Sequence, residues 1–143
     1  MAITQDLTLR DWTVSRLNTE VPGFFSFTSN VNWANDTDVY VSSVQPAAGA
    51  VCVAKSTGAG FPGTWHAAQN GLPDLPVERL LVDSRRPSGQ SLFAATDRGV
   101  YHTSDGGANW SLFGSGLPQV AVRDLYMPAD GRFLRVATYG RGV

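Results

Sequence analysis

The fold of this chain is decided by the stretch Thr103-Ser104-Asp105-Gly106-Gly107-Ala108-Asn109-Trp110, which lies between two apolar segments. Gly106 and Gly107 can adopt positive φ without a Cβ penalty, so the chain can reverse sharply here. The serine, aspartate and asparagine side chains can bond to their own backbone and hold the loop closed. Trp110 then returns a large apolar ring to the next strand. The stretch predicts a tight hairpin whose last residue is buried.

Working outward from Trp110, the same residue types recur at an offset of 45 residues. The recurring pairs are Trp65 and Trp110, Gly71 and Gly116, Val77 and Val122, and Leu80 and Leu125. A period of about 40–50 residues, with several short strands in each unit, is typical of β-propeller blades. The repeat therefore predicts an all-β fold built from such units.

The best-preserved unit predicts strands at residues 77–83, 91–96, 100–103 and 110–113. Residues 84–90 form a loop because they include Pro87 and Gly89, and Asp97-Arg98-Gly99 forms a tight turn. The run Leu80-Leu81-Val82 lacks alternation, which indicates an inner strand buried on both faces. These strands predict one four-stranded antiparallel blade.

The remaining units are less regular. Residues 24–28 take the place of the inner strand in the earlier unit, and residues 39–43 that of the second strand. The hairpin from Ser56 to Trp65 is three residues longer than its counterpart and lacks the aspartate. The last unit has strands at 122–127 and 133–138, while residues 3–9 and 12–17 precede the first inner strand. We expect no helix, and one domain over residues 1–143 with about three blades, at 24–65, at 77–113, and at 122–143 combined with 1–17.

The hairpin resembles the Asp-box, or BNR repeat, of sialidase-like and xyloglucanase-like β-propellers, with the pattern Ser-x-Asp-x-Gly-x-x-Trp. The match covers Ser104, Asp105, Gly107 and Trp110, and either Thr103 or Ser104 can supply the hydroxyl. The resemblance implies a structural role for the box, including Gly106, because in that family the hairpin lies away from the ligand end of the central channel. It also implies an extracellular or periplasmic protein, although residues 1–10 contain no signal peptide.

Composition excludes several classes of function. The 143-residue chain has a net charge of −1, so nothing favours binding to nucleic acid or to a membrane surface. Cys52 is the only cysteine, which rules out an internal disulfide and a cysteine-based zinc site. His66 and His102 are too few to indicate a metal centre. We therefore expect no metal and no cofactor.

The turn between the second and third strands of each unit is the candidate ligand face. Its residues are Asp97 and Arg98 in one unit and Tyr139 and Arg141 in the next. Arginine suits carboxylates and tyrosine suits sugar faces. The alternative is that these are solvated turn residues with local ion pairs. Trp12, Trp65 and Trp110 are expected to fill the core between blades, whereas Trp33 lies outside the repeat positions.

The sequence assigns no catalytic residue. Glycoside hydrolysis usually needs two carboxylates, and the only glutamates are Glu20 and Glu78, a turn residue and a strand residue. The Phe/Tyr-Arg-Ile-Pro motif of sialidases is absent. The favoured function is a non-catalytic binding or scaffold module for a carbohydrate or protein ligand. The alternative is a fragment of a sialidase- or xyloglucanase-like glycoside hydrolase whose acids lie in missing blades.

Three blades cannot close a ring, because propellers typically have about 4–8. Residues 3–9 and 12–17 of a second copy could supply the outer strands that 122–127 and 133–138 lack. This predicts a homodimer with about six closed blades. The rival account is a truncated chain whose other blades belong to a longer protein.

Overall fold

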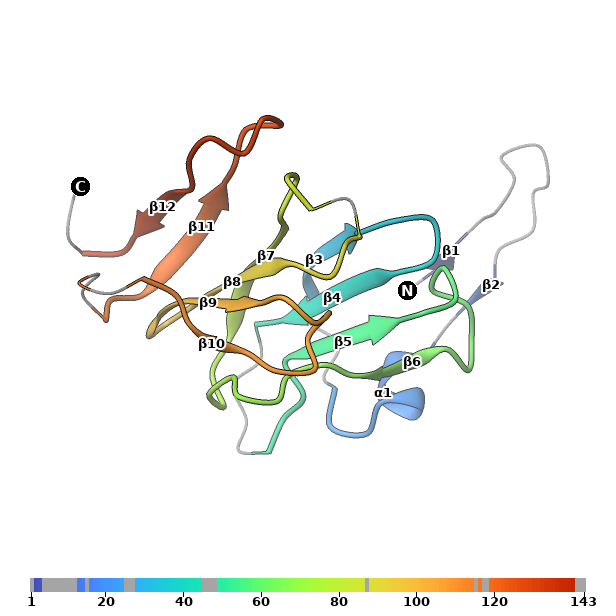
Figure 1. Cartoon of the computed structure of the whole chain (residues 1–143). Helices are drawn as coiled ribbons and strands as arrows, with labels where there is room; N and C mark the ends of the chain where they lie inside the picture. Colours follow the sequence, from blue (N-terminus) through green and yellow to red (C-terminus); the bar gives the residue numbers. More distant parts are fainter. Residues whose placement is uncertain are drawn as a thin grey trace.

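The computed structural model describes residues 2–3, 13–14, 16–24, 28–44, 49–86, 88–114, 116 and 119–140 (Figure 1). Within these residues the chain forms twelve strands and one helical turn. In chain order they are β1 (Ala2–Ile3), β2 (Thr13–Val14), α1 (Leu17–Glu20), β3 (Thr28–Trp33), β4 (Val39–Ser43), β5 (Val53–Ser56), β6 (Trp65–Ala67), β7 (Val77–Val82), β8 (Leu92–Thr96), β9 (Gly99–Thr103), β10 (Ser111–Leu112), β11 (Val122–Tyr126) and β12 (Arg135–Thr138).

The protein is mostly β, and its sheets are antiparallel meanders in which consecutive strands pair. Two sheets have four strands, in the orders β3-β4-β5-β6 and β7-β8-β9-β10, and β11 pairs with β12. The pair β1–β2 forms a separate sheet. The first strands of the three main sheets lie side by side, because β7 contacts both β3 and β11 (Figure 1). Among the described residues, the sheets do not close into a barrel or a ring.

Alternating side chains of the middle strands fill the layers on either side of each sheet. On β8, Leu92 and Ala94 lie in a central cluster with residues of β4 and β5, including Tyr40 and Val53. Phe93 and Ala95 point the other way, into a C-terminal cluster that contains residues of β11. All five residues of β8 are buried. This explains why the strand is almost entirely apolar.

A third, N-terminal cluster covers the opposite face of the sheet β3–β6. It joins α1 to residues of β4, β5 and β6, and Trp65 lies in it. Trp110 belongs to the central cluster. The prediction that these two tryptophans are buried is therefore confirmed, while Trp12 lies outside the described residues. Trp33, on β3, is 53% exposed.

Most predicted strands are confirmed. Strand β4 has the predicted bounds. Strand β7 ends one residue earlier than predicted, and β8 begins one residue later. The predicted segments also overlap β9, β10, β11 and β12. The prediction that the run Leu80-Leu81-Val82 is buried on both faces of its strand was wrong in one respect. Leu80 is fully buried, but Leu81 and Val82 are only half-buried. Strand β7 is the edge of its hydrogen-bonded sheet and is flanked by β3 and β11 without pairing to them.

The prediction of an inner strand at residues 24–28 was wrong. Phe24 makes an isolated bridge to Val51, residues 25–27 lie outside the description, and β3 begins only at Thr28. The loop 34–38 between β3 and β4 is shorter than the loop 83–91 between β7 and β8. The one-turn helix α1, which the sequence did not predict, adds length upstream. A constant offset from Trp12 could not detect these compensating changes.

The predicted strands at 3–9 and 12–17 are only partly described. Ala2 pairs with Val14 and Ile3 pairs with Thr13, and the residues between these two short strands lie outside the description. Leu17 belongs to α1 instead of to a strand. Where the chain is described, it contains no helix long and apolar enough to cross a membrane.

Candidate functional site

The hairpin 103–110 between β9 and β10 is organised around the hydroxyl of Thr103. Its Oγ1 accepts hydrogen bonds from the backbone N–H of Asp105 at 3.3 Å and of Gly107 at 3.1 Å, and donates to Asp105 Oδ1 at 2.7 Å. Asp105 Oδ1 also accepts from the backbone N–H of Asn109 at 2.9 Å. The hydroxyl that holds this hairpin is thus that of Thr103, and Ser104 is exposed.

The hairpin between β5 and β6 repeats this arrangement without the aspartate. Ser56 Oγ accepts from the backbone N–H of Gly58 at 3.1 Å and of Gly60 at 2.8 Å, the same spacing along the chain as at Thr103. Ala59 and Gly60 have positive φ, as Gly106 and Gly107 do. Ser56 corresponds to Thr103 and not to Ser104, so the hairpin is two residues longer and not three as predicted.

The hairpin 103–110 packs on the strip 68–71, which follows β6 of the preceding sheet. The Trp110 indole Nε1 donates to the carbonyl of Ala68 at 2.9 Å, and the Trp110 backbone N–H donates to the carbonyl of Asn70 at 2.8 Å. Gly71 and Gly107 allow close approach: a Cβ at Gly71 would lie 2.3 Å from the Trp110 carbonyl oxygen. The hairpin therefore locks two sheets together.

A buried polar network strengthens the same junction. Lys55 Nζ pairs with Asp38 Oδ2 at 3.1 Å, and Gln90 Nε2 donates to the same oxygen at 2.8 Å. The backbone N–H of Gly106 donates to the carbonyl of Gln90 at 2.8 Å. Burial raises the pKa of Asp38, but the hydrogen bonds from Lys55 and Gln90 outweigh it, so the pKa is lowered. Both charged groups of this ion pair have partners within the protein, which favours a role in holding the two sheets together over a role in binding a ligand.

The contacts of Asp105 predict an acid-sensitive hairpin. Hydrogen bonds from the Asn109 side chain and from Thr103 lower the pKa of Asp105 from 3.8 to about 2. A lowered pKa in the folded state stabilises the protein above the unfolded value, and the stabilisation is lost as pH falls through the folded value. We expect the difference in melting temperature between the wild type and Asp105→Ala to be constant at neutral pH. It should shrink between pH 3.8 and about 2.

The measurement is thermal unfolding of both proteins across this pH range. Asp36→Ala is the matched control, because Asp36 is an exposed aspartate in the loop 34–38. Like the wild type, the Asp36→Ala protein should lose stability between pH 3.8 and about 2, because it keeps the hydrogen bonds of Asp105. If the Asp105→Ala difference persists undiminished at pH 2, the ionised carboxylate is not what holds the hairpin.

At the opposite end of the sheets, Arg123 brings together part of the predicted ligand face. Arg123 Nη1, on β11, forms ion pairs with Glu78 on β7 and with Asp97 Oδ1 at 3.3 Å in the β8–β9 turn. Its guanidinium lies 5.7 Å from the ring centroid of Tyr139. Asp97 and Tyr139 therefore meet in space, with Tyr139 74% exposed.

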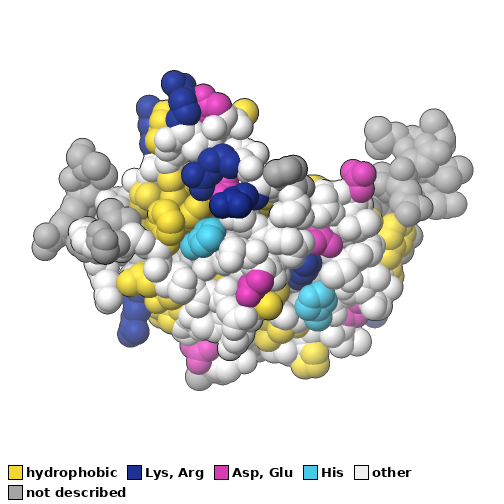
Figure 2. All heavy atoms as spheres, in the orientation of Figure 1, with side chains coloured by type: hydrophobic (Ala, Val, Ile, Leu, Met, Phe, Trp, Pro, Cys, Tyr) yellow, Lys and Arg dark blue, Asp and Glu magenta, His cyan; other side chains and the backbone are white. Residues whose placement is uncertain are grey.

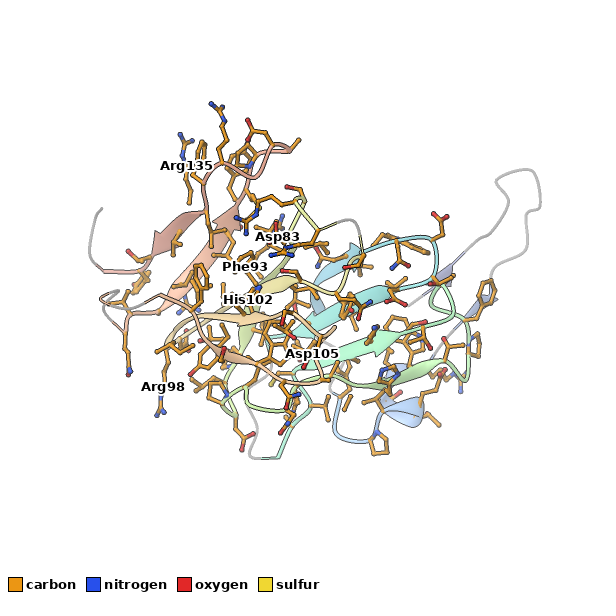
Figure 3. The ribbon with its side chains drawn as sticks, in the orientation of Figure 1. Asp83, Phe93, Arg98, His102, Asp105 and Arg135 are labelled. Carbon is orange, nitrogen blue, oxygen red and sulfur yellow. The ribbon has the colours of Figure 1, made fainter. Side chains whose placement is uncertain are left out.

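The other two predicted ligand residues are not part of this cluster. Arg98 is exposed, its backbone N–H donates to Thr96 Oγ1 at 3.1 Å, and its side chain points away from the sheets (Figure 3). Arg141 lies outside the described residues. The predicted face thus consists of one ion-paired aspartate, one exposed arginine and one exposed tyrosine.

The ion pair between Arg123 and Glu78 was not predicted, although the 45-residue repeat places opposite charges at equivalent positions. Glu78-Arg79 and Arg123-Asp124 are separated by the 45-residue period and have opposite charge order. Because β7 and β11 lie side by side, equivalent positions meet, and Arg79 Nε also pairs with Asp124 Oδ1 at 3.5 Å. Comparing charges at one period along neighbouring inner strands would have found both pairs.

A second polar cluster lies at the other end of β7, β8 and β9, around Asp83 (Figure 3). The buried Asp83 carboxylate accepts from Arg85 Nε at 2.8 Å and Nη2 at 2.7 Å, and from Ser91 Oγ at 3.3 Å. Ser91 Oγ lies 3.0 Å from His102 Nε2. The hydrogen bond from Arg85 lowers the pKa of Asp83, and burial lowers that of His102.

This cluster does not have the geometry of a nucleophilic triad. Asp83 bonds to the serine, whereas a triad needs the carboxylate to orient the histidine. If Ser91 gives its single proton to Asp83, the Ser91–His102 hydrogen bond requires His102 Nε2 to be the donor, and in that tautomer the ring is not a base for Ser91. Ser91 is also only 6% exposed. The cluster instead ties the loop 83–91 to β9.

No three His, Cys, Asp or Glu side chains within the described ranges are grouped in a way that could hold a metal ion. No family model, curated protein or solved structure matches this chain. The described residues therefore form a mostly β protein with antiparallel sheets and a polar cluster at each end of β7, β8 and β9.

Proposed function

We propose that the chain forms consecutive blades of an Asp-box β-propeller that acts as a non-catalytic binding or scaffold module. The sheets β3–β6 and β7–β10 would be complete blades, with β3, β7 and β11 innermost. The observation that carries this proposal is the hydroxyl-centred hairpin, which recurs at Ser56 and at Thr103 with the same backbone contacts. Each hairpin is followed by a buried tryptophan, which suits a repeated blade-to-blade joint.

The ligand face of this module would be the end that carries Asp97, Arg98 and Tyr139. An exposed tyrosine ring beside a guanidinium offers a stacking surface together with charged hydrogen-bond donors. This chemistry suits the acidic or hydroxyl groups of a carbohydrate, or a polar protein surface. Glu78 supports the face indirectly, because its ion pair holds Arg123 in place.

Binding at this face predicts that Arg98→Ala and Tyr139→Ala each weaken the ligand without changing the melting temperature. For Arg98, a lost charge-assisted contact costs about 1.5–3 kcal/mol, which is roughly tenfold or more in affinity. The measurement is a glycan array, and a binding screen against candidate proteins, followed by titration of the best ligand. Arg86→Ala is the matched control, because Arg86 is an exposed arginine in the loop 83–91 at the other end of the sheets.

A panel of fluorogenic glycosides separates this proposal from a hydrolase fragment. Turnover that persists through purification and is lost in Glu78→Gln or Asp97→Asn would replace the binding module with an enzyme. Unchanged affinity in both Arg98→Ala and Tyr139→Ala, with a ligand in hand, would place the binding site elsewhere.

The proposal also requires more sheets than the structure contains, because propellers typically have about 4–8 blades. Further blades could come from a second copy or from additional sequence.

A further inference from the structure

Two strand pairs of this chain lack the partners that strands in the complete sheets have. The pair β11–β12 matches the first and second strands of the complete sheets. Its register shifts between Val122 and Asp124, as β7–β8 does between Val77 and Arg79, one period earlier. Val122 pairs with Thr138 as Val77 pairs with Thr96. Third and fourth strands are missing from this sheet in the described part of the chain.

The pair β1–β2 matches the third and fourth strands. Ile3 pairs with Thr13, as His102 pairs with Ser111 and Lys55 with His66. In all three pairs the first residue precedes a threonine or serine and the second follows a tryptophan. The sequence Thr4-Gln5-Asp6 moreover repeats the hydroxyl and carboxylate of Thr103-Ser104-Asp105. Among the described residues, this pair has no first or second strand beside it.

Phe113 and Gly116 are described residues of the strip that would receive this hairpin, and both are exposed. The Phe113 backbone N–H donates to Val100 at 2.8 Å, as that of Ala68 donates to Val53 at 2.9 Å. Phe113 thus corresponds to Ala68, the residue whose carbonyl holds the Trp110 indole. Gly116 corresponds to Gly71 and has the same positive φ, but nothing lies within 4 Å of its Cβ position.

The surface around this strip is apolar. Phe113 is 40% exposed, and its ring lies 5.0 Å from that of Phe93 and 5.8 Å from that of His102. Figure 2 shows hydrophobic side chains gathered over this part of the molecule, next to the region where Figure 3 labels Phe93 and His102. In the central cluster, the equivalent surface is covered by Trp110.

The strands β1 and β2 of the same molecule do not cover this strip. Figure 1 shows them beyond the sheet β3–β6, at the opposite end of the stack from β11 and β12. A second copy can supply them, and a two-fold axis makes the exchange mutual. We propose that β1–β2 of each copy pairs with β12 of the other and completes its sheet, with the β1–β2 hairpin against Phe113 and Gly116. This inference rests on the propeller proposed above.

The proposal specifies a register. Because Thr138 corresponds to Thr96, Arg135 corresponds to Phe93, which pairs with His102. Ile3 corresponds to His102, so Ile3 of one copy should lie opposite Arg135 of the other.

Cysteine cross-linking tests this register directly. In a Cys52→Ala background, Ile3→Cys and Arg135→Cys are made as separate proteins, refolded together and oxidised gently. The mixture should yield a linked species of twice the 15.3 kDa chain mass, and neither protein alone should do so. Ile3→Cys mixed with Arg98→Cys is the control, since Arg98 lies at the other end of the strands. A folded mixture without the linked species, or equal linking in the control, overturns the proposal.

Light scattering gives a second, independent test through Gly116→Val. We expect the wild type to be a dimer, and the variant to be a folded monomer because the valine fills the strip. Gly49→Val is the control, since Gly49 also has positive φ and open space around it. A wild-type monomer, or a Gly116→Val dimer, would contradict the exchange. A cross-linked dimer that binds no ligand would support the strand exchange and contradict the binding function. A monomer that binds a ligand through Tyr139 would support the binding function and contradict the strand exchange.

Discussion

Replacing Trp110 with alanine is expected to lower the free energy of unfolding by about 3–5 kcal/mol, which is enough to unfold many domains of this size. The ring is only 5% exposed and lies in the central cluster between two sheets. Its indole N–H also donates to the carbonyl of Ala68, which would lose its partner. The cavity and the lost hydrogen bond act on the same joint between the sheets. Denaturant unfolding followed by far-ultraviolet circular dichroism, instead of by tryptophan fluorescence, measures this free energy of unfolding.

Trp33→Ala is the matched control for this substitution. Trp33 is 53% exposed on β3, so its removal should cost less than about 1 kcal/mol. A Trp110→Ala protein that unfolds at the same denaturant concentration as Trp33→Ala would mean that the ring does not hold the sheets together.

The second large effect is expected from Gly71→Ala, a change of one methyl group. Gly71 has a φ of 87°, which costs an alanine about 1–2 kcal/mol. The new Cβ would also lie 2.3 Å from the Trp110 carbonyl oxygen, so one backbone segment must move. Overpacking of this kind typically costs about 1–3 kcal/mol more. We expect a total loss of roughly 3 kcal/mol in the free energy of unfolding.

Gly49→Ala separates backbone strain from steric conflict. Gly49 has a φ of 74°, and its Cβ position has nothing within 4 Å. The strain is therefore shared by the two variants, and the contact with Trp110 is not. Equal destabilisation of Gly71→Ala and Gly49→Ala would show that the hairpin does not press against the strip 68–71.

Strands could be predicted from this sequence where the signal is local. The bounds of β4 agree with the prediction, and β7 begins at the predicted Val77, because apolar runs bounded by turn residues identify strands without reference to distant residues. The burial of Trp65 and Trp110 followed from the 45-residue period. The inner strand of the first unit was misplaced, because α1 and a shortened loop change the offset in opposite directions.

By itself, the sequence determined the mostly β class, the repeated unit and the tight turn at residues 103–110, since each depends on residues close together in the chain or on a regular period. Only the tertiary structure decided that Thr103, and not Ser104, holds the hairpin, because both hydroxyls are within reach along the chain. The packing of β7 beside β11 decided the partners of Arg123. Contacts between sheets depend on how the sheets stack, and no local pattern of residues specifies that arrangement.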